Sequence, residues 1–179
     1  MLGLNPKEVK LVSHNPEWTQ LYQQEELLLK QLVGNDAVGI EHIGSTAIQD
    51  IHAKPIIDIM VGVRSLNPED RLDLKQMRKG YYYPLQKQTM EGKIIFAKFP
   101  EIDEGNHTKT HYIHVVKHGG DWWKAHINFR DRLKESPGLA REYEDLKLKL
   151  AKSHPNDAMA YGQAKEEFIN RVIGSEQDK

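Results

Sequence analysis

The strongest constraint on the fold is residues 55–63 (PIIDIMVGV), an almost wholly apolar run that contains one carboxylate, Asp58. Its length and β-branched residues favour a strand buried on both faces. Side chains alternate along a strand, so Asp58 shares its face with Ile56 and Met60. A buried carboxylate is costly unless it is paired. Asp58 therefore needs either a bound cation or a structural salt bridge or hydrogen bond on that face.

The turn Gly44-Ser45-Thr46 follows a short strand-like segment, residues 38–43. Glycine lets the backbone turn sharply and approach a ligand closely, and the two residues after it add hydroxyl groups. A helix that started there would offer free N–H groups to an anion, and Lys54 would add a positive charge for a phosphate. Turns of this composition are common, so the turn alone does not specify a ligand.

The remaining elements follow from the spacing of apolar residues and from turn signals. Helices are expected from Asn15-Pro16 to Gly34, from Asn67-Pro68 to Gly80, and at about 120–134, 137–153 and 156–173. Strands are expected at 38–43, 55–63, 93–99 and 110–117, with a short helix or loop at 47–53. This order predicts a small mixed β-sheet covered by helices, in the α/β or α+β class, with a helical C-terminal part.

Composition narrows the class of protein. The chain has 179 residues, and at about 150 residues per domain we expect one domain over residues 1–179. Its net charge of −1 argues against nucleic-acid binding through bulk positive charge, although a local basic face stays open. The lack of cysteine excludes thiol catalysis. No apolar run suits a signal peptide or a membrane span, so we expect a cytoplasmic protein without a membrane partner.

Histidine is concentrated in one part of the chain. Five of the nine histidines are His107, His111, His114, His118 and His126. Residues 110–117 (THYIHVVK) have β-type composition, and on a strand His111 and His114 point to opposite faces. A local three-histidine zinc site is therefore not favoured. His114 is instead a candidate to face the same cleft as Asp58, as a ligand, general base or phosphate contact. The alternative for His114 is a hydrogen-bonded position at the edge of the core.

Residues 40–63 (IEHIGSTAIQDIHAKPIIDIMVGV) resemble the signature of the GrpB family. The resemblance continues in residues 111–116 (HYIHVV), 129–151 (FRDRLKESPGLAREYEDLKLKLA) and 161–169 (YGQAKEEFI), and so covers most of the chain. It implies a nucleotidyltransferase-like fold, in a domain that some bacteria fuse to dephospho-CoA kinases. In that superfamily a Gly-Ser turn positions nucleotide phosphates, and carboxylates on the adjacent strand hold the divalent metals that assist phosphoryl transfer.

The resemblance carries over residue by residue. Gly44 and Ser45 match the phosphate turn, and Asp58 matches the first metal-binding carboxylate. Met60 stands where the superfamily usually has a second acid, and a thioether is a poor ligand for Mg²⁺. Either nearby groups replace that acid, or the site has lost metal-dependent catalysis.

The predicted site combines these candidates. The expected catalytic groups are Asp58, His114 and Glu41. The expected metal ligands are Asp58 and His42, for a divalent cation such as Mg²⁺ or Mn²⁺. The expected phosphate contacts are Gly44, Ser45, Thr46, Lys54 and Arg130. Arg130 has an alternative interpretation, a salt bridge to Asp131, Glu135 or another acid.

These residues support two main classes of function. The first is an enzyme that binds a nucleotide with a divalent metal and transfers a nucleotidyl or phosphoryl group to an unknown acceptor. The second is a non-catalytic module that binds a nucleotide or another phosphorylated small molecule, as an accessory to coenzyme A metabolism. A metal-dependent hydrolase built on the histidines is a weaker third class.

Overall fold

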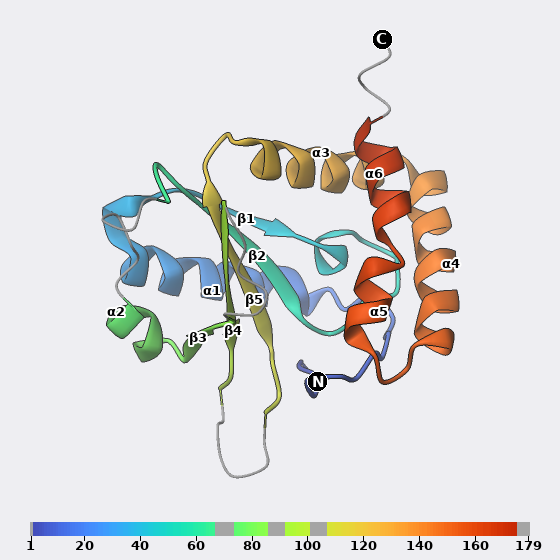
Figure 1. The fold of residues 1–179 in the computed structure, drawn as a ribbon, viewed down its shortest axis with the longest axis horizontal. Coiled ribbons are helices and arrows are strands. Elements are labelled where there is room, and N and C mark those ends of the chain that lie inside the picture. Colours follow the sequence, from blue (N-terminus) through green and yellow to red (C-terminus); the bar gives the residue numbers. More distant parts are fainter. Residues whose placement is uncertain (1, 67–73, 86–91, 101–106, 175–179) are drawn as a thin grey trace.

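In the computed structural model, residues 2–66, 74–85, 92–100 and 107–174 are described, and they form a five-stranded mixed sheet with helices on both faces (Figure 1). The strands are β1 (Ala37–Ile43), β2 (Ile57–Val63), β3 (Tyr82–Pro84), β4 (Lys93–Lys98) and β5 (His111–Lys117). Their order is β1-β2-β5-β4-β3. The central strands β2 and β5 are parallel, and the other neighbouring pairs are antiparallel. The expected α+β class with a mixed sheet is confirmed.

The described helices largely follow the predicted order. They are α1 (Glu17–Val33), α2 (Leu74–Lys79), α3 (Asp121–Glu135), α4 (Pro137–Ser153), α5 (Ala158–Gln163) and α6 (Glu166–Gly174), with the 3₁₀ turns η1 (Gly34–Asp36) and η2 (Ser45–Ala47). The expected start of the second helix, at Asn67-Pro68, lies outside the described residues. Of the described helices, none has the length and apolar character that a membrane crossing requires.

The single helix expected over residues 156–173 is wrong. The Asp157 side chain accepts the N–H groups of Met159 and Ala160, and this cap sets the start of α5. After α5 the N–H of Lys165 bonds to the carbonyl of Gly162, three residues back, and this tighter turn separates α5 from α6.

The two faces of β2 enter separate cores, as its alternating pattern predicts. Ile57 and Ile59 pack in a cluster that includes side chains of α1 and α2. Met60 packs with Ile43 on the other face, where the side chains of α3 cover the sheet. Asp58 shares this second face. The end of β2 that carries Asp58 therefore points toward the helical C-terminal part.

The segment before α1 is tied to distant parts of the chain by backbone hydrogen bonds. Leu4 pairs with Lys109, and Val12 pairs with Ala53 in an antiparallel bridge. Both hydrogen bonds of the second bridge measure 2.9 Å. This bridge fixes the position of the loop that leads from η2 to β2.

A buried ion pair lies beneath the sheet on the α1 side. Glu25 of α1 accepts hydrogen bonds from Lys98 Nζ at 2.7 and 2.8 Å and from the hydroxyl of Tyr82. His111 Nε2 lies 3.9 Å from Glu25. Glu25 is 6% exposed, and a carboxylate so deeply buried is tolerated because it is paired and hydrogen-bonded.

Candidate functional site

Gly44 joins β1 to the turn η2, and its conformation requires glycine. Its φ is +70°, and a Cβ at this position would lie 2.5 Å from Asp58 Oδ2. The turn and the carboxylate predicted to form one site are therefore in contact. The turn itself is a single 3₁₀ turn, closed by the N–H of Ala47 on the carbonyl of Gly44. No α-helix starts at this turn, so the anion site that free N–H groups at a helix start would provide is not formed here.

The turn and Asp58 border a small cavity, which we call the turn pocket. Its volume is about 70 Å³, and it is lined by Gly44, Ser45, Thr46, Lys54, Ile56, Asp58, Tyr143, Tyr161 and Lys165. Pockets that hold whole small molecules measure roughly 300–1,000 Å³. The turn pocket therefore suits one group of about the size of a phosphoryl group. It brings together most of the residues that the sequence predicts as phosphate contacts.

Two lysines from distant parts of the sequence meet at the turn pocket. Lys54 Nζ and Lys165 Nζ lie 5.2 and 4.6 Å from the centre of the Tyr161 ring. Burial and the like charge of Lys165 lower the pKa of Lys54 to about 8. Burial also lowers the pKa of Lys165, against the opposing charge of Asp58. With both lysines protonated and one carboxylate ionised, the pocket keeps a positive charge that an anion would complement.

Asp58 is bonded to His114 of the neighbouring strand β5, a contact that the sequence did not predict. His114 Nε2 lies 3.4 Å from Asp58 Oδ1. Burial raises the pKa of Asp58, but the hydrogen bond from His114 and the charges of Lys54 and Lys165 hold it below its usual value. The carboxylate is therefore ionised at neutral pH. His114 does not itself line the turn pocket.

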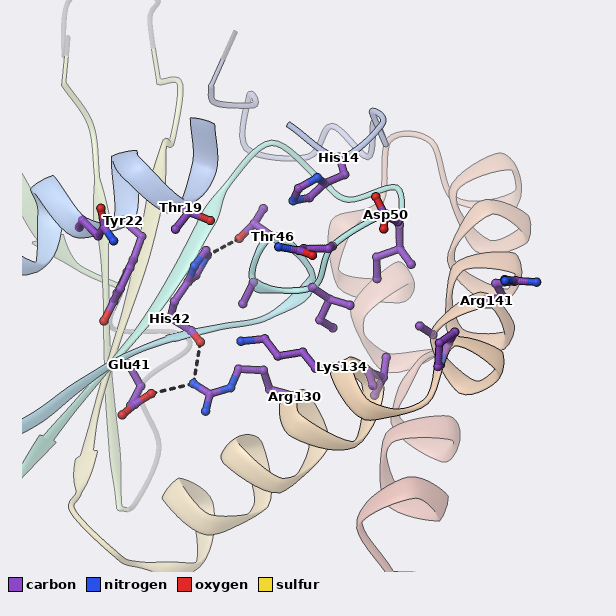
Figure 2. Close-up of a pocket in the computed structure, with 18 residues that line it drawn as sticks. His14, Thr19, Tyr22, Glu41, His42, Thr46, Asp50, Arg130, Lys134 and Arg141 are labelled. Atoms are coloured by element: carbon purple, nitrogen blue, oxygen red, sulfur yellow. Dashed lines mark hydrogen bonds and ion pairs between the residues drawn. The ribbon is translucent and has the colours of Figure 1, made fainter. Parts of the chain in front are cut away.

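Other predicted site residues lie in a second cavity, which we call the groove (Figure 2). The groove has a volume of about 750 Å³ and lies between α1, the segment that follows β1, and the helices α3 and α4. Thr46 lines both cavities. Its hydroxyl bonds to His42 Nε2 at 2.9 Å. Burial lowers the pKa of His42 to about 4, so this ring is neutral at pH 7.

The structure does not bring His42 and Asp58 together as joint metal ligands. In the β1–β2 register His42 is opposite Ile59, while Asp58 is opposite Ile43. Directly opposed residues project from the same face of a sheet, so His42 faces α1 and Asp58 faces the C-terminal helices. Within the described ranges, no group of three or more histidine or acidic side chains is arranged to hold a metal ion.

Arg130 is held by ion pairs on the wall of the groove. Its Nη1 donates to Glu41 Oε2 at 2.7 Å and to the carbonyl of His42 at 3.0 Å, and its Nε donates to Asp131 at 2.7 Å. The salt-bridge interpretation of Arg130 is thus confirmed, with Glu41 as a second acid. Figure 2 shows Lys134 extending from α3 beside Arg130. Glu41 is engaged by Arg130 and does not line the turn pocket.

The turn pocket offers a divalent metal few ligands. Asp58 is the single carboxylate among its described lining residues, and Met60 is fully buried in the core. Mg²⁺ is commonly held by one or two carboxylates together with waters and substrate phosphates. These residues therefore fit a cation only when a bound phosphate shares it.

Sequence reasoning missed Lys165, Tyr161 and Tyr143. Lys165 looks like one of many solvent-facing charges, and the two tyrosines fit the apolar stripes of their helices. Residues 161–169 were part of the family resemblance, and this was the one available signal for Lys165 and Tyr161.

The comparisons confirm the resemblance, and the chain belongs to the GrpB family. The family model described as "GrpB protein" matches residues 8–175. The chain is 43% identical to the glutamate-rich protein GrpB of Alkalihalophilus pseudofirmus, over 97% of this chain and 98% of that protein. It is also similar to the crystal structure of the conserved protein GrpB from Enterococcus faecalis, with a TM-score of 0.78 and 29% identity. That likeness covers 93% of this chain and 96% of the other.

A longer relative carries a more specific name. The dephospho-CoA kinase of Mycobacterium leprae is 27% identical over 89% of this chain. The match spans 44% of that protein. It shows that sequences of this family also occur as part of larger proteins.

Proposed function

We propose that this protein binds the phosphate of a nucleotide, or of another phosphorylated small molecule, in the turn pocket. The observation that supports the proposal is that Lys54 and Lys165 line the same small cavity, which is about the size of a phosphoryl group. The turn at Gly44 lines this cavity as well. One carboxylate, Asp58, offsets only part of their charge. A bound phosphate would complete the charge balance, because strong anion binding needs a surplus of fixed donors and cations.

Each residue of the turn pocket has a distinct part in this proposal. Lys54 and Lys165 neutralise the phosphate, and the hydroxyl groups of Ser45 and Thr46 donate hydrogen bonds to its oxygens. Gly44 lets the backbone come close to the ligand. The charge of Asp58 opposes the loss of a proton from either lysine in the absence of ligand.

A second candidate function is metal-assisted nucleotidyl transfer to an unknown acceptor. It is favoured by the contact between the ionised Asp58 and the turn at Gly44. Asp58 would hold Mg²⁺ or Mn²⁺ together with the phosphates, and the metal would supply neutralisation of charge in phosphoryl transfer. His114 would orient the Asp58 carboxylate. In this candidate function, Glu41 and His42 line the groove and are not ligands of the metal.

Thermal unfolding with a ligand panel tests both functions. The panel contains nucleoside triphosphates and phosphorylated coenzyme A precursors, each with and without Mg²⁺ or Mn²⁺. A ligand at 100 times its dissociation constant stabilises by about 2.7 kcal/mol. For a chain of this size that corresponds to a rise of roughly 5–11 °C in Tm. The variants are Lys54→Met, Lys165→Met and Asp58→Asn, with Lys152→Met on the exposed face of α4 as the matched control.

The outcomes separate the candidates. A rise in Tm that needs no metal and disappears in both pocket-lysine variants supports phosphate binding. A rise that needs the metal and disappears in Asp58→Asn supports the nucleotidyltransferase candidate. If no ligand in the panel raises Tm, or if Lys152→Met loses as much as Lys54→Met, the turn pocket is not the binding site.

A further inference from the structure

A second set of reactive side chains is formed by residues that line neither cavity. Ser13 Oγ is 3.3 Å from His52 Nε2, and His52 Nδ1 is 2.7 Å from Glu144 Oε1. A serine, a histidine and a carboxylate therefore follow one another, and each ring nitrogen faces a different oxygen. None of the three lines the turn pocket or the groove.

The backbone explains why Ser13 and His52 meet. Val12 and Ala53 exchange both hydrogen bonds of an antiparallel bridge. Ser13 and His52 are the next pair along this ladder, where the hydrogen bonds point outward and side chains approach most closely. The outward N–H of His52 donates to Glu144 Oε1 at 2.6 Å. The same carboxylate oxygen thus holds both the backbone and the ring of His52.

The charge of Glu144 decides which ring nitrogen of His52 donates a hydrogen bond and which one accepts. Burial raises the pKa of Glu144, but the hydrogen bonds from the backbone and ring of His52 hold it below its usual value. An ionised carboxylate only accepts, so His52 Nδ1 must donate to it. In the neutral ring Nε2 is then an acceptor, and its lone pair faces Ser13 Oγ. This is the tautomer that a general base for a serine nucleophile requires.

We propose that Ser13, His52 and Glu144 form a nucleophile, a general base and a positioning carboxylate that hydrolyse carboxylic esters. A nucleophile hydrogen-bonded to a base that a third group orients is the diagnostic arrangement for such chemistry. The His52 side chain is 41% exposed and that of Glu144 is 17% exposed. The base is thus open to a substrate while the positioning carboxylate is shielded.

The reaction proceeds in two balanced steps. Ser13 Oγ forms a bond to the ester carbonyl carbon, and its proton moves to His52 Nε2. The bond to the alcohol oxygen breaks, and the alcohol leaves with that proton. Water then attacks the acyl-serine and passes its proton through His52 to Ser13 Oγ, which releases the carboxylic acid and restores the serine.

The surroundings offer donors for the developing oxyanion and space for a substrate. Ser13 is exposed, and the backbone N–H groups of Ser13 and His14 donate to no acceptor within the described part of the chain. Backbone N–H groups at and after a nucleophile can bind the oxyanion. His14 and Ile51, the sequence neighbours of the reactive pair, line the groove. We expect an ester whose body lies in the groove.

The same contacts also have a structural role that does not involve Ser13. Glu144, together with a hydrogen bond from Lys147 Nζ to the carbonyl of His52, fastens the loop before β2 to α4. A clamp of this kind needs no nucleophile. The test therefore measures the reactivity of Ser13, whose substitution leaves the clamp intact.

The experiment has two readouts on the intact protein. Hydrolysis of p-nitrophenyl acetate is followed by absorbance, and labelling by a fluorophosphonate is located by peptide mass spectrometry. We expect turnover and an adduct on Ser13 in the wild type. Ser13→Ala loses both, and the exposed control Ser153→Ala keeps both. His52→Gln slows labelling by at least about 100-fold, the usual contribution of a general base.

Glu144 is tested as a positioning residue. Glu144→Gln slows labelling of Ser13, and Glu144→Asp restores part of the rate, while Tm is measured in parallel to separate any loss of the clamp. Turnover that Ser13→Ala leaves unchanged overturns the proposal, whatever the histidine variant does. Labelling that is absent from Ser13, or equally fast in His52→Gln, also overturns it.

Discussion

Gly44 and Asp58 form a contact that leaves no room for a side chain, since a Cβ on Gly44 would lie 2.5 Å from Asp58 Oδ2. The turn after β1 and the buried strand β2 are therefore fitted to each other. A shift of either one changes the position of the carboxylate relative to the backbone of the turn pocket. This contact makes Gly44 the most sensitive backbone position in the candidate site.

Gly44→Ala is expected to reduce ligand binding and to lower stability. A non-glycine residue held at positive φ costs about 1–3 kcal/mol, and the new methyl group would displace Asp58. Urea unfolding gives the loss of stability, and the rise in Tm with ligand gives the loss of binding. Gly138→Ala in α4, where an added Cβ meets nothing within 4 Å, is the control. Equal effects of the two substitutions would contradict this account of Gly44.

The affinity for an anion in the turn pocket is expected to fall as the pH rises above about 8. The pKa of Lys54 is lowered to about 8 by burial and by Lys165, and only the protonated amine attracts a phosphate. Loss of one proton weakens binding by at most about tenfold per pH unit. Titration calorimetry with pyrophosphate between pH 7 and 9.5 measures this. Lys54→Arg, which stays charged, should flatten the decline, and an unchanged profile would exclude Lys54 as the cause.

The fold is expected to lose stability as the pH falls from about 6.5 to 4. Burial lowers the pKa of both His42 and His111 to about 4, against about 6.5 in the unfolded chain. Between these values the unfolded chain binds protons that the folded chain does not. Stability is therefore complete above pH 6.5 and declines below it, by about 1.4 kcal/mol per pH unit for each fully coupled histidine. Urea unfolding at several pH values gives the slope.

Substitutions show which histidine causes the loss of stability at low pH. His42→Gln should reduce the slope of stability against pH between 6.5 and 4. His107→Gln, at an exposed position, should leave the slope as in the wild type. A wild-type slope that persists in His42→Gln would show that other groups cause the sensitivity.

The fold is expected to be sensitive to single substitutions in the buried pair of Glu25 and Lys98. Lys98→Met leaves the carboxylate of Glu25 buried with less compensation, at a cost of about 3–5 kcal/mol. The double variant Glu25→Gln with Lys98→Met should recover part of that loss, because no unpaired charge remains. The control is the pair of the exposed Lys30 and the half-buried Glu26, and Lys30→Met should cost under about 1 kcal/mol. Denaturant unfolding of these variants checks each value.

The spacing of apolar residues predicted which strands and helices form where an element is long enough to show a period. The alternation in residues 55–63 correctly separated Ile57 and Ile59 from Asp58 and Met60. The strand β3 (Tyr82–Pro84) was not predicted, because three residues carry no periodic signal. The break between α5 and α6 also escaped notice, since a tight turn inside a helical pattern leaves the spacing of apolar residues almost unchanged.

The sequence predicted those residues of the candidate site that lie close together along the chain. Gly44, Lys54 and Asp58 are near one another in the sequence, and the structure places all three at the turn pocket. Strand alternation made His114 a candidate for the face of Asp58, and the pairing of β2 with β5 brings the two side chains to 3.4 Å. Lys165 comes from the far end of the chain, and only the packing of the C-terminal helices brings it there. The separation of His42 from Asp58 depends on the β1–β2 register, which a single sequence does not specify.

The parallel pairing of β2 with β5 has a consequence for synthesis of the chain on the ribosome. Ile57 pairs with His111, so β2 emerges well before the strand that covers its second edge. At about 5–20 residues per second the delay is roughly 3–11 s. An apolar strand with an open edge invites aggregation during that time. Asp58 is the one charge in β2, and a charge within an apolar strand is the kind of residue that opposes aggregation while that edge is open.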